Sequence, residues 1–350
     1  MVARSSAESA AVDQLDRQIL QGLRLAPRVP FARLAAVLAV SEQTVARRYQ
    51  RMRTRGLIRV FGQADPERLP GTTYWTLRIS CRPGTAAVTA QALARRTDTS
   101  WVTIGAGGAE LTCAVRVTAD HDRREGLLHH LPRATNVLSL SAHQVLHRFV
   151  GRGETDWIAG DEQLSADQRE QLLDGADPGV RADPEMRVTD EGGARVEAGD
   201  RALLAALARD GRAGYAALAT VTGWTQRKVA LRLGALIAAR AVYFDTEVAA
   251  SLMGFRSAAN LWLTVAPADL AAVGARLADH RQLAWAAAVT GTATITAIAL
   301  CRDAEELYRY LTTEIAAIPE IRTCETVPVL SRVKHAVSLV DGGVLGEPVL

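Results

Sequence analysis

Residues 31–60 read FARLAAVLAVSEQTVARRYQRMRTRGLIRV, and this stretch decides the fold of the first domain. Apolar residues recur at helical spacing over residues 31–38, and a second helical pattern follows Ser41 after a short break. Ser41 fits the N-cap of that second helix, because its hydroxyl can accept a free backbone N–H of the first turn. Gly56 fits the position after a helix, where a left-handed backbone costs little. The stretch therefore predicts two helices joined by a tight turn.

The second predicted helix is strongly basic. Residues 42–59 contain six arginines and a single acid, Glu42. Two helices joined by a short turn, with the second one basic, are typical of a helix-turn-helix (HTH) whose second helix enters the DNA major groove. The alternative is a basic helix face that is only solvated, and the ordered set of turn, polar cap, basic helix and glycine favours DNA. The predicted DNA contacts are Ser41, Gln43, Thr44, Arg47, Arg48, Arg51, Arg53 and Arg55.

Composition limits the class of protein. The chain has 350 residues, of which 48% are hydrophobic, and this length suffices for two or three domains. No apolar run approaches the roughly 20 residues that span a bilayer, and the N-terminus lacks the apolar core of a signal peptide. We therefore expect a cytoplasmic protein with no membrane partner. The four cysteines lie far apart, so the sequence predicts no disulfide framework, no metal site and no cofactor.

Charge is unevenly distributed along the chain. Residues 1–150 carry 21 Lys and Arg against 11 Asp and Glu, whereas residues 151–198 carry 5 against 13. The first third is therefore the cationic part, as a polyanion-binding face requires. Residues 151–198 are also rich in Gly, Pro and Asp, and we expect an acidic linker in which only residues 164–173 have a helical pattern.

The segment after the first HTH alternates in element type. The patterns predict a strand over 73–81, a helix over 85–96, two strands around a glycine turn within 101–117, a helix over 120–131, and a strand over 136–147. This β-α-β-β-α-β order is the ferredoxin-like split unit. Its two helices would cover one face of an antiparallel sheet and leave the other face for a partner.

A repeat with a period of 184 residues runs through both domain types. The matched pairs include Asp16/Asp200, Arg48/Arg232, Trp101/Trp285 and Arg148/Arg332. The predicted fold class is therefore α+β, an HTH domain followed by a ferredoxin-like domain, with the pair duplicated in tandem. The predicted boundaries are 13–62 and 72–150 for the first copy, 151–198 for the linker, and 199–246 and 256–340 for the second copy.

The second predicted HTH has lost most of its basic surface. At the repeat offset, Arg47 becomes Leu231 and Arg51 becomes Ala235. Three basic residues remain as candidate phosphate contacts: Arg227, Lys228 and Arg232. Phosphate contact and a purely packing role are equally open for this degenerate domain.

The residues LDRQILQGL (15–23), the stretch 34–60 and the following βαββαβ pattern, seen twice, resemble the Lrp/AsnC (leucine-responsive/asparagine regulator) family of transcription factors. The resemblance implies that the ferredoxin-like sheets form homo-oligomers and bind a small effector, commonly an amino acid. A tandem chain would form the dimer-like unit within one polypeptide. The family's effector region matches residues 106–110 and 290–294, which makes Gly107, Glu110 and Gly291 the effector-binding candidates; a plain hairpin turn is the alternative for the glycines.

The sequence thus favours a sequence-specific double-stranded DNA-binding transcriptional regulator that is not an enzyme and has no catalytic residues. The alternative is an enzyme, because siroheme decarboxylases are similar in architecture and hold a tetrapyrrole in the βαββαβ cleft. On that resemblance the residues available to bind substrate carboxylates are His129, His130, His143 and Arg148. A third interpretation is an assembly partner that does not bind DNA.

Overall fold

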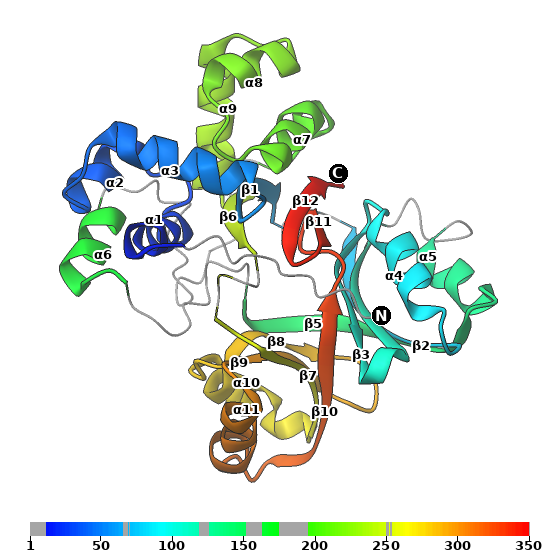
Figure 1. Cartoon of the computed structure of the whole chain (residues 1–350). Coiled ribbons are helices and arrows are strands. Elements are labelled where there is room, and N and C mark those ends of the chain that lie inside the picture. The colour runs from blue at the N-terminus through cyan, green and yellow to red at the C-terminus, as the bar shows by residue number, and fades with distance from the viewer. Residues whose placement is uncertain are drawn as a thin grey trace, which may run out of the picture.

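The structure is a computed structural model that describes residues 12–65, 69, 71–118, 126–151, 163–174, 195–249, 252 and 254–349. Two copies of an HTH domain followed by a ferredoxin-like domain make up the chain (Figure 1), so the predicted α+β class and the tandem duplication are confirmed. Most of the predicted linker 151–198, and residues 120–125 of one predicted helix, lie outside the described residues.

The first copy follows the predicted order. Its HTH consists of α1 (Gln14–Leu25), α2 (Phe31–Val37) and α3 (Glu42–Thr54), and β1 (Ile58–Ala64) leads out of it. Its ferredoxin-like domain consists of β2 (Thr72–Cys81), α4 (Ala86–Ala94), β3 (Thr99–Gly105), β4 (Glu110–Thr118), α5 (Leu127–His130) and β5 (Val137–Val150).

The second copy repeats this order after α6 (Ala166–Leu173). Its HTH consists of α7 (Arg201–Arg209), α8 (Tyr215–Thr222) and α9 (Gln226–Ala238), followed by β6 (Val242–Val248). Its ferredoxin-like domain consists of β7 (Ser257–Val265), α10 (Leu270–Ala278), β8 (Leu283–Val289), β9 (Ile295–Cys301), α11 (Ala304–Tyr310) and β10 (Ile321–Arg332). A hairpin of β11 (Ser338–Asp341) and β12 (Val344–Pro348) ends the described chain.

The first HTH forms as its sequence signals predict. The Ser41 hydroxyl accepts the backbone N–H of Thr44 at 3.2 Å and so caps α3. Gly56 has a φ of 65° after the end of the helix. Val45, Tyr49 and Met52 are buried in the core of the domain. The N-cap and the glycine stop therefore set both ends of α3.

A buried ion pair is repeated in the two HTH domains. In the first, the fully buried carboxylate of Asp16 accepts from Arg48 at 2.9 Å and from Arg51 at 2.5 Å. In the second, Asp200 accepts from Arg232 at 2.7 Å. The two aspartates and the arginines Arg48 and Arg232 are repeat equivalents, and the aspartate ties the first helix of each domain to the third. Both arginines therefore serve the fold of their own domain.

The two HTH domains form one unit, here called the HTH platform. Strands β1 and β6 pair antiparallel from Ile58–Val248 to Ala64–Val242 and join the domains. The contact is reciprocal: Arg28 donates to the backbone carbonyls of Gly211 and Ala213, and the equivalent Arg212 donates to those of Pro27 and Val29. A local two-fold relationship between the copies follows from this exchange.

The two ferredoxin-like sheets close into one eight-stranded barrel with the order β10-β3-β4-β2-β5-β8-β9-β7. Each sheet buries one face under its own helices, as the alternation of Leu77 and Ile79 with polar neighbours in β2 predicts. The long strands β5 and β10 cross over to the other copy, where β5 pairs with β8 and β10 pairs with β3. The face predicted to await a partner is therefore covered within the same chain.

Two segments outside the repeat pack against the HTH platform. Leu164, just before α6, and Leu172, within α6, are buried in the core of the first HTH, so this predicted helix in the linker packs against a domain. At the C-terminal hairpin, the backbone N–H of Leu345 donates to Gly56 at 2.7 Å, and Arg59 donates to Gly346 at 2.9 Å. The hairpin thus connects the end of α3 to the barrel.

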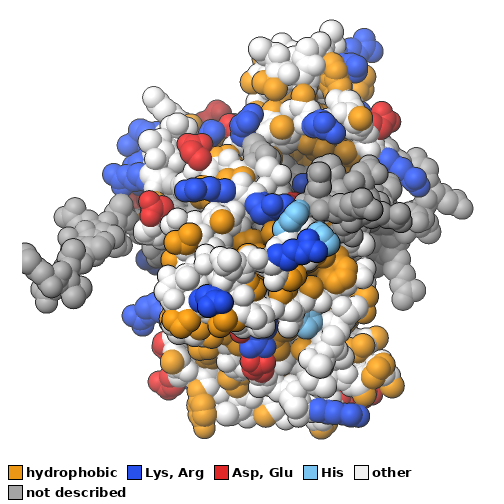
Figure 2. All heavy atoms as spheres, turned by 90° about the vertical axis from the view of Figure 1, so that its right-hand side faces the viewer, with side chains coloured by type: hydrophobic (Ala, Val, Ile, Leu, Met, Phe, Trp, Pro, Cys, Tyr) orange, Lys and Arg blue, Asp and Glu red, His pale blue; other side chains and the backbone are white. Residues whose placement is uncertain are grey.

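On the face of the molecule that carries α4 and α5, basic, acidic and apolar side chains of the described residues are interspersed (Figure 2). Within the part of the chain that the structure describes, no helix has the length and apolar character to cross a membrane. The described residues also contain no group of His, Cys, Asp and Glu placed to hold a metal ion, and the four cysteines are free thiols.

The close approach of the two HTH domains at Gly211 generates a test of the platform. A Cβ on Gly211 would lie 2.7 Å from the Phe61 backbone, so Gly211→Ala should cost about 1–3 kcal/mol of unfolding free energy through overpacking. Gly234→Ala is the matched control, because it lies on an open face of α9 and should stabilise that helix by roughly 0.5–1 kcal/mol. Equal urea midpoints for the two variants would contradict the packing of the platform.

Candidate ligand-binding cavity

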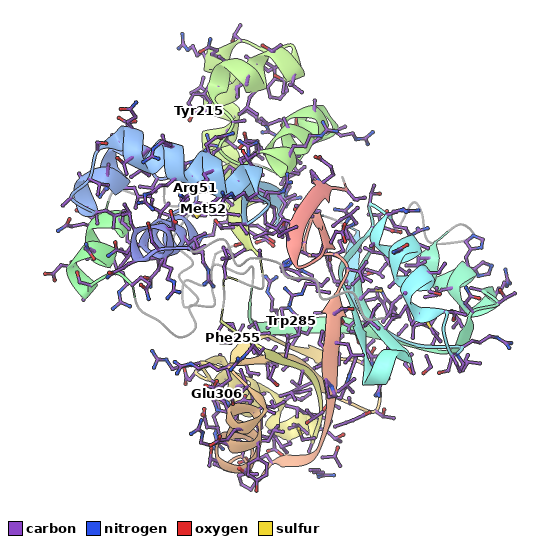
Figure 3. The ribbon with its side chains drawn as sticks, in the orientation of Figure 1. Arg51, Met52, Tyr215, Phe255, Trp285 and Glu306 are labelled. Atoms are coloured by element: carbon purple, nitrogen blue, oxygen red, sulfur yellow. The ribbon has the colours of Figure 1, made fainter. Side chains whose placement is uncertain are left out.

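A cavity of about 440 Å³ lies in the barrel at the end that faces the HTH platform. Gln63, Ala64 and Tyr243, from the β1–β6 ribbon, line it on the platform side, and strands of both ferredoxin-like sheets line the rest. Trp285 lies where the barrel faces the platform (Figure 3). The volume falls within the range of small-molecule sites in proteins.

The lining combines aromatic rings with positive charge. The aromatic side chains are Tyr74, Trp101, Tyr243 and Trp285, and the basic ones are Arg116, His147, Arg148 and Arg332. Among the described residues that line the cavity there is no Asp or Glu. A planar ligand that carries carboxylates suits such a lining, because arginine binds carboxylates with two parallel hydrogen bonds and indole rings stack on flat apolar surfaces.

The order of strands sets each repeat pair on opposite sides of the cavity. In the closed barrel β2 lies across from β7, β3 from β8, β4 from β9 and β5 from β10. Trp101 and Trp285 therefore come from opposite strands, and so do Arg148 and Arg332. The local two-fold axis runs along the barrel, and the cavity lies on it.

Tyr74 and Arg116 form a cross-strand pair on the first-copy wall. Burial raises the pKa of Tyr74 to about 12, and the neighbouring Arg116 guanidinium, which hydrogen-bonds the phenol, offsets only part of that rise. The phenol is therefore neutral near pH 7 and remains a hydrogen-bond donor. The pair presents one cation and one hydroxyl to the same region of the cavity.

A second cluster gathers around Trp101, whose backbone has a φ of 54°. The backbone N–H of Trp101 donates to the His335 carbonyl at 2.9 Å. The indole ring lies 5.5 Å from the His335 ring, and the Arg332 guanidinium lies 5.3 Å from the indole, over its face. A bulky residue at positive φ is strained and persists only where its surroundings hold it. Contacts from the end of β10 and from the segment that follows it hold this indole against the cavity.

Polar contacts close the barrel below the cavity. Asn260 donates to the Thr112 hydroxyl across the barrel at 3.3 Å. Further down, Arg78 on β2 pairs with Glu110 at 2.7 Å and with Glu325 of the other copy at 2.5 Å. The cavity therefore has a floor at this end of the barrel.

The three predicted effector residues do not line the cavity. Glu110 lies beneath the floor and pairs with Arg78. Gly291 has a φ of 114° and packs against the ring of His143 at the turn between β8 and β9, while Gly107 lies on the surface at the equivalent turn of the first copy. The two glycines come from separate turns, and their role in effector binding stays a prediction.

Some of the predicted DNA contacts make ion pairs or ring contacts within the protein, and some are exposed to solvent. Arg51 and Lys228 belong to both groups. Arg48 and Arg51 pair with Asp16, Arg48 also pairs with Asp13 at 2.6 Å, and Arg53 pairs with Asp210 at 3.0 Å. In the second copy Arg232 is held by Asp200, and Lys228 lies 4.3 Å over the Trp224 ring. The residues of the set that the structure leaves exposed are Ser41, Gln43, Arg47, Arg51, Arg55, Arg227 and Lys228, and Thr44 is half-buried.

Of the residues proposed for a tetrapyrrole site, Arg148 alone lines the cavity. His143 is buried below the floor, where its Nδ1 lies 2.7 Å from the Thr290 carbonyl oxygen, and His129 and His130 are exposed on α5. Sequence reasoning missed Tyr74, Arg116 and His147 because they belong to three strands. The available signal was strand alternation, which puts Tyr74 on the face opposite to the core residue Leu77.

The buried phenol of Tyr74 generates a pH prediction. Its folded-state pKa, about 12, exceeds the unfolded value near 10, so the stability linked to this group is fully present below pH 10 and falls as pH rises from about 10 to 12. Tyr74→Phe should therefore lose less stability over that interval than the parent protein, as measured by urea denaturation. Tyr308→Phe, at a position 68% exposed, is the control, and identical pH profiles for parent and Tyr74→Phe would contradict the burial.

Comparison with known proteins bears on both domain types. The model of the AsnC-type helix-turn-helix domain matches residues 12–53 and 198–237, and the model of the Lrp/AsnC ligand binding domain matches residues 258–339. No curated protein matches the chain significantly.

Among solved structures, the siroheme decarboxylase NirDL is similar over the full length, with a TM-score of 0.61, 10% identity and 93% coverage of both chains. Its co-complex with an iron-uroporphyrin III analogue has a TM-score of 0.60 and 11% identity, also with 93% coverage of both chains. AsnC of E. coli, at 24% identity and a TM-score of 0.35, covers 39% of this chain and 94% of its own.

The full-length match corrects one expectation from the sequence. We expected a chain that is not an enzyme, but the protein that shares the entire tandem architecture is a decarboxylase, so this expectation is contradicted. The basic helix α3 led to it, since no catalytic constellation is visible in the sequence and the cavity forms only when the barrel closes. Taken together, the two matched HTH domains, the matched ligand binding domain and the fold show that the chain belongs to the Lrp/AsnC family, in a tandem-duplicated form.

Proposed function

We propose that the protein is an enzyme that binds a tetrapyrrole carboxylate in the barrel cavity and removes carboxyl groups from it as CO₂. The observation that carries this proposal is the lining: three arginines, one histidine and several aromatic rings, with no acid among the described lining residues. The full-length similarity to a siroheme decarboxylase supports the same conclusion at the level of fold.

The arginines account for substrate binding. Arg148 and Arg332 approach from opposite strands, and Arg116 lies beside the Tyr74 phenol. Guanidinium groups remain charged at all physiological pH values and fit carboxylates in a bidentate geometry. A macrocycle bearing carboxylates on its edge would be held by these groups, with its flat face against Trp101 or Trp285.

The reaction needs a proton at the carbon that loses CO₂. When the bond between a side-chain methylene and its carboxylate breaks, CO₂ leaves, and the electron pair stays on the methylene carbon and delocalises into the macrocycle. One proton converts that carbon to a methyl group, which balances the step. His147 is the candidate donor, because it lines the cavity on β5 and is also exposed to water, from which it can be reprotonated.

A register shift in β5 supports this role of His147. The pairing of β5 with β8 shifts between Val145 and His147, which leaves Leu146 unpaired. Such bulges re-aim side chains and recur next to active sites.

Decarboxylation can be measured directly. Under anaerobic conditions the purified protein should convert siroheme to products that have lost CO₂, as detected by mass spectrometry. His147→Gln should lower kcat by about 100-fold or more, because a positioned general acid contributes roughly that factor. His129→Gln is the matched control, since His129 is exposed on α5 outside the cavity. Absence of any CO₂ loss with the folded parent protein would refute the proposal.

A second candidate function is DNA binding through α3. It is favoured by the exposed ridge of Arg47, Arg51 and Arg55 on α3. The ridge follows the capped N-terminus of this helix, as in HTH proteins whose second helix enters the major groove. Against it, Arg51 also pairs with Asp16, and the equivalent face of α9 carries the exposed Leu231. This candidate and the decarboxylase proposal concern different surfaces and can both hold.

The ridge can be tested with duplex DNA at several salt concentrations. The double variant Arg47→Ala/Arg55→Ala should weaken binding and reduce the slope of log affinity against log salt by about one per arginine, because each arginine contacts a phosphate. The double variant Arg95→Ala/Arg322→Ala removes two exposed arginines outside the HTH domains and should leave the slope unchanged. Equal slopes for the two double variants would exclude DNA contact by α3.

A further inference from the structure

One face of the β1–β6 ribbon of the HTH platform points toward the barrel. Successive residues of a strand alternate between its two faces, and cross-strand partners share a face. The ribbon residues that are buried in the cores of the two HTH domains are Ile58, Val60, Val242, Phe244 and Val248. The intervening cross-strand pairs therefore point away from those cores, and they are Arg59–Glu247, Phe61–Asp245 and Gln63–Tyr243. The Gln63–Tyr243 pair lines the barrel cavity.

The local two-fold axis relates the two outer pairs to each other. Phe61 and Asp245 are repeat equivalents and form the central pair, so the axis passes between them. By the same offset of 184 residues, the Gln63–Tyr243 pair is equivalent to the Glu247–Arg59 pair. The ribbon thus presents two equivalent positions, one on each side of the axis, and they can be compared directly.

The C-terminal segment of the chain covers the Arg59–Glu247 position. Arg59 donates to the Gly346 carbonyl at 2.9 Å. One carboxylate oxygen of Glu247 accepts the backbone N–H groups of Val337 and Ser338 at 2.9 and 3.2 Å. At the equivalent position across the axis, the Gln63–Tyr243 pair faces the cavity of about 440 Å³. One pair therefore binds the protein's own chain, whereas its counterpart faces the space for a ligand.

The pair that faces the cavity is neutral and can donate hydrogen bonds. Gln63 donates from its Nε2 to the hydroxyl oxygen of Tyr243. Burial raises the pKa of the Tyr243 phenol far above its ordinary value, the Asp245 carboxylate raises it further, and Arg148 acts in the opposite direction. The phenol therefore keeps its proton near pH 7. Because Arg148 also lines the cavity and lies close enough to affect this phenol, one carboxylate can contact both groups.

We infer that Gln63 and Tyr243 are substrate-binding residues, and that the HTH platform thereby completes the tetrapyrrole site of the barrel. The Tyr243 hydroxyl donates to a carboxylate of the macrocycle that Arg148 also holds, and the Gln63 amide orients the phenol. This inference rests on the proposed function and assigns some of its substrate contacts to the platform. It gives the HTH domains a role in the reaction that does not depend on DNA.

The repeat itself suggests the sharpest variant. Gln63→Glu keeps the shape of the side chain and copies the equivalent residue Glu247, but it places a negative charge at the cavity. In fluorescence titration of the full-length protein with uroporphyrin III, whose carboxylates surround the macrocycle, this variant should bind at least about tenfold more weakly, because like charges repel in a partly buried site. Gln91→Glu adds the same charge at an exposed position of α4 outside the cavity and should bind as the parent does.

Tyr243→Phe removes the hydroxyl alone and provides a second variant if Gln63→Glu does not fold. It should weaken uroporphyrin binding about tenfold and raise the KM for siroheme far more than it lowers kcat, because the hydrogen bond forms in the ground state as well as in the transition state. A residue that only packs the ribbon would lower the urea midpoint and leave KM unchanged. Tyr308→Phe, at a position 68% exposed, is the matched control.

The outcomes separate this inference from the proposed function. If the parent binds uroporphyrin and the folded Gln63→Glu and Tyr243→Phe proteins bind it equally tightly, the inference is overturned and the tetrapyrrole proposal stands. If the parent binds neither uroporphyrin nor siroheme, the tetrapyrrole proposal is overturned, and the inference falls with it.

Discussion

The pairing of β5 with β8, and of β10 with β3, is the interaction on which the rest of the structure depends. These two long strands carry each copy of the ferredoxin-like unit onto the sheet of the other, so that two open antiparallel sheets become one closed barrel. Closure removes the free sheet edges and encloses the polar faces that point away from the helices. The cavity, its floor and its opposite pairs of equivalent residues are all consequences of this closure.

Much of the fold could be predicted from local signals because those signals act within a few residues. Ser41 caps α3 and Gly56 ends it for reasons visible in the sequence, and alternation in β2 separates core from non-core positions. The 184-residue repeat then predicts the second copy. That repeat also pairs Arg148 with Arg332, which together line the cavity. What the repeat leaves open is how the copies face each other.

The candidate site could not be predicted in the same way, because its residues meet only across the barrel. Tyr74, Arg116 and His147 come from three strands, and nothing in their spacing brings them together. The basic helix illustrates the same limit: the sequence alone does not reveal that Asp16 lies against Arg48 and Arg51. Charge counted along a helix overstates charge available to a partner when a buried carboxylate of the same domain neutralises part of it.

Covalent fusion of the two copies has an evolutionary consequence. In a homodimer each substitution appears twice, once on each side of the axis, so an arginine gained on one side is also gained on the other. Here Leu300 lies at the repeat position of Arg116, and both line the cavity. A mutation at Leu300 therefore alters the second-copy side of the cavity alone. Gene duplication therefore allows the two copies to change independently of each other. A symmetric ancestor could acquire a polar and an apolar side without having to assemble two different subunits.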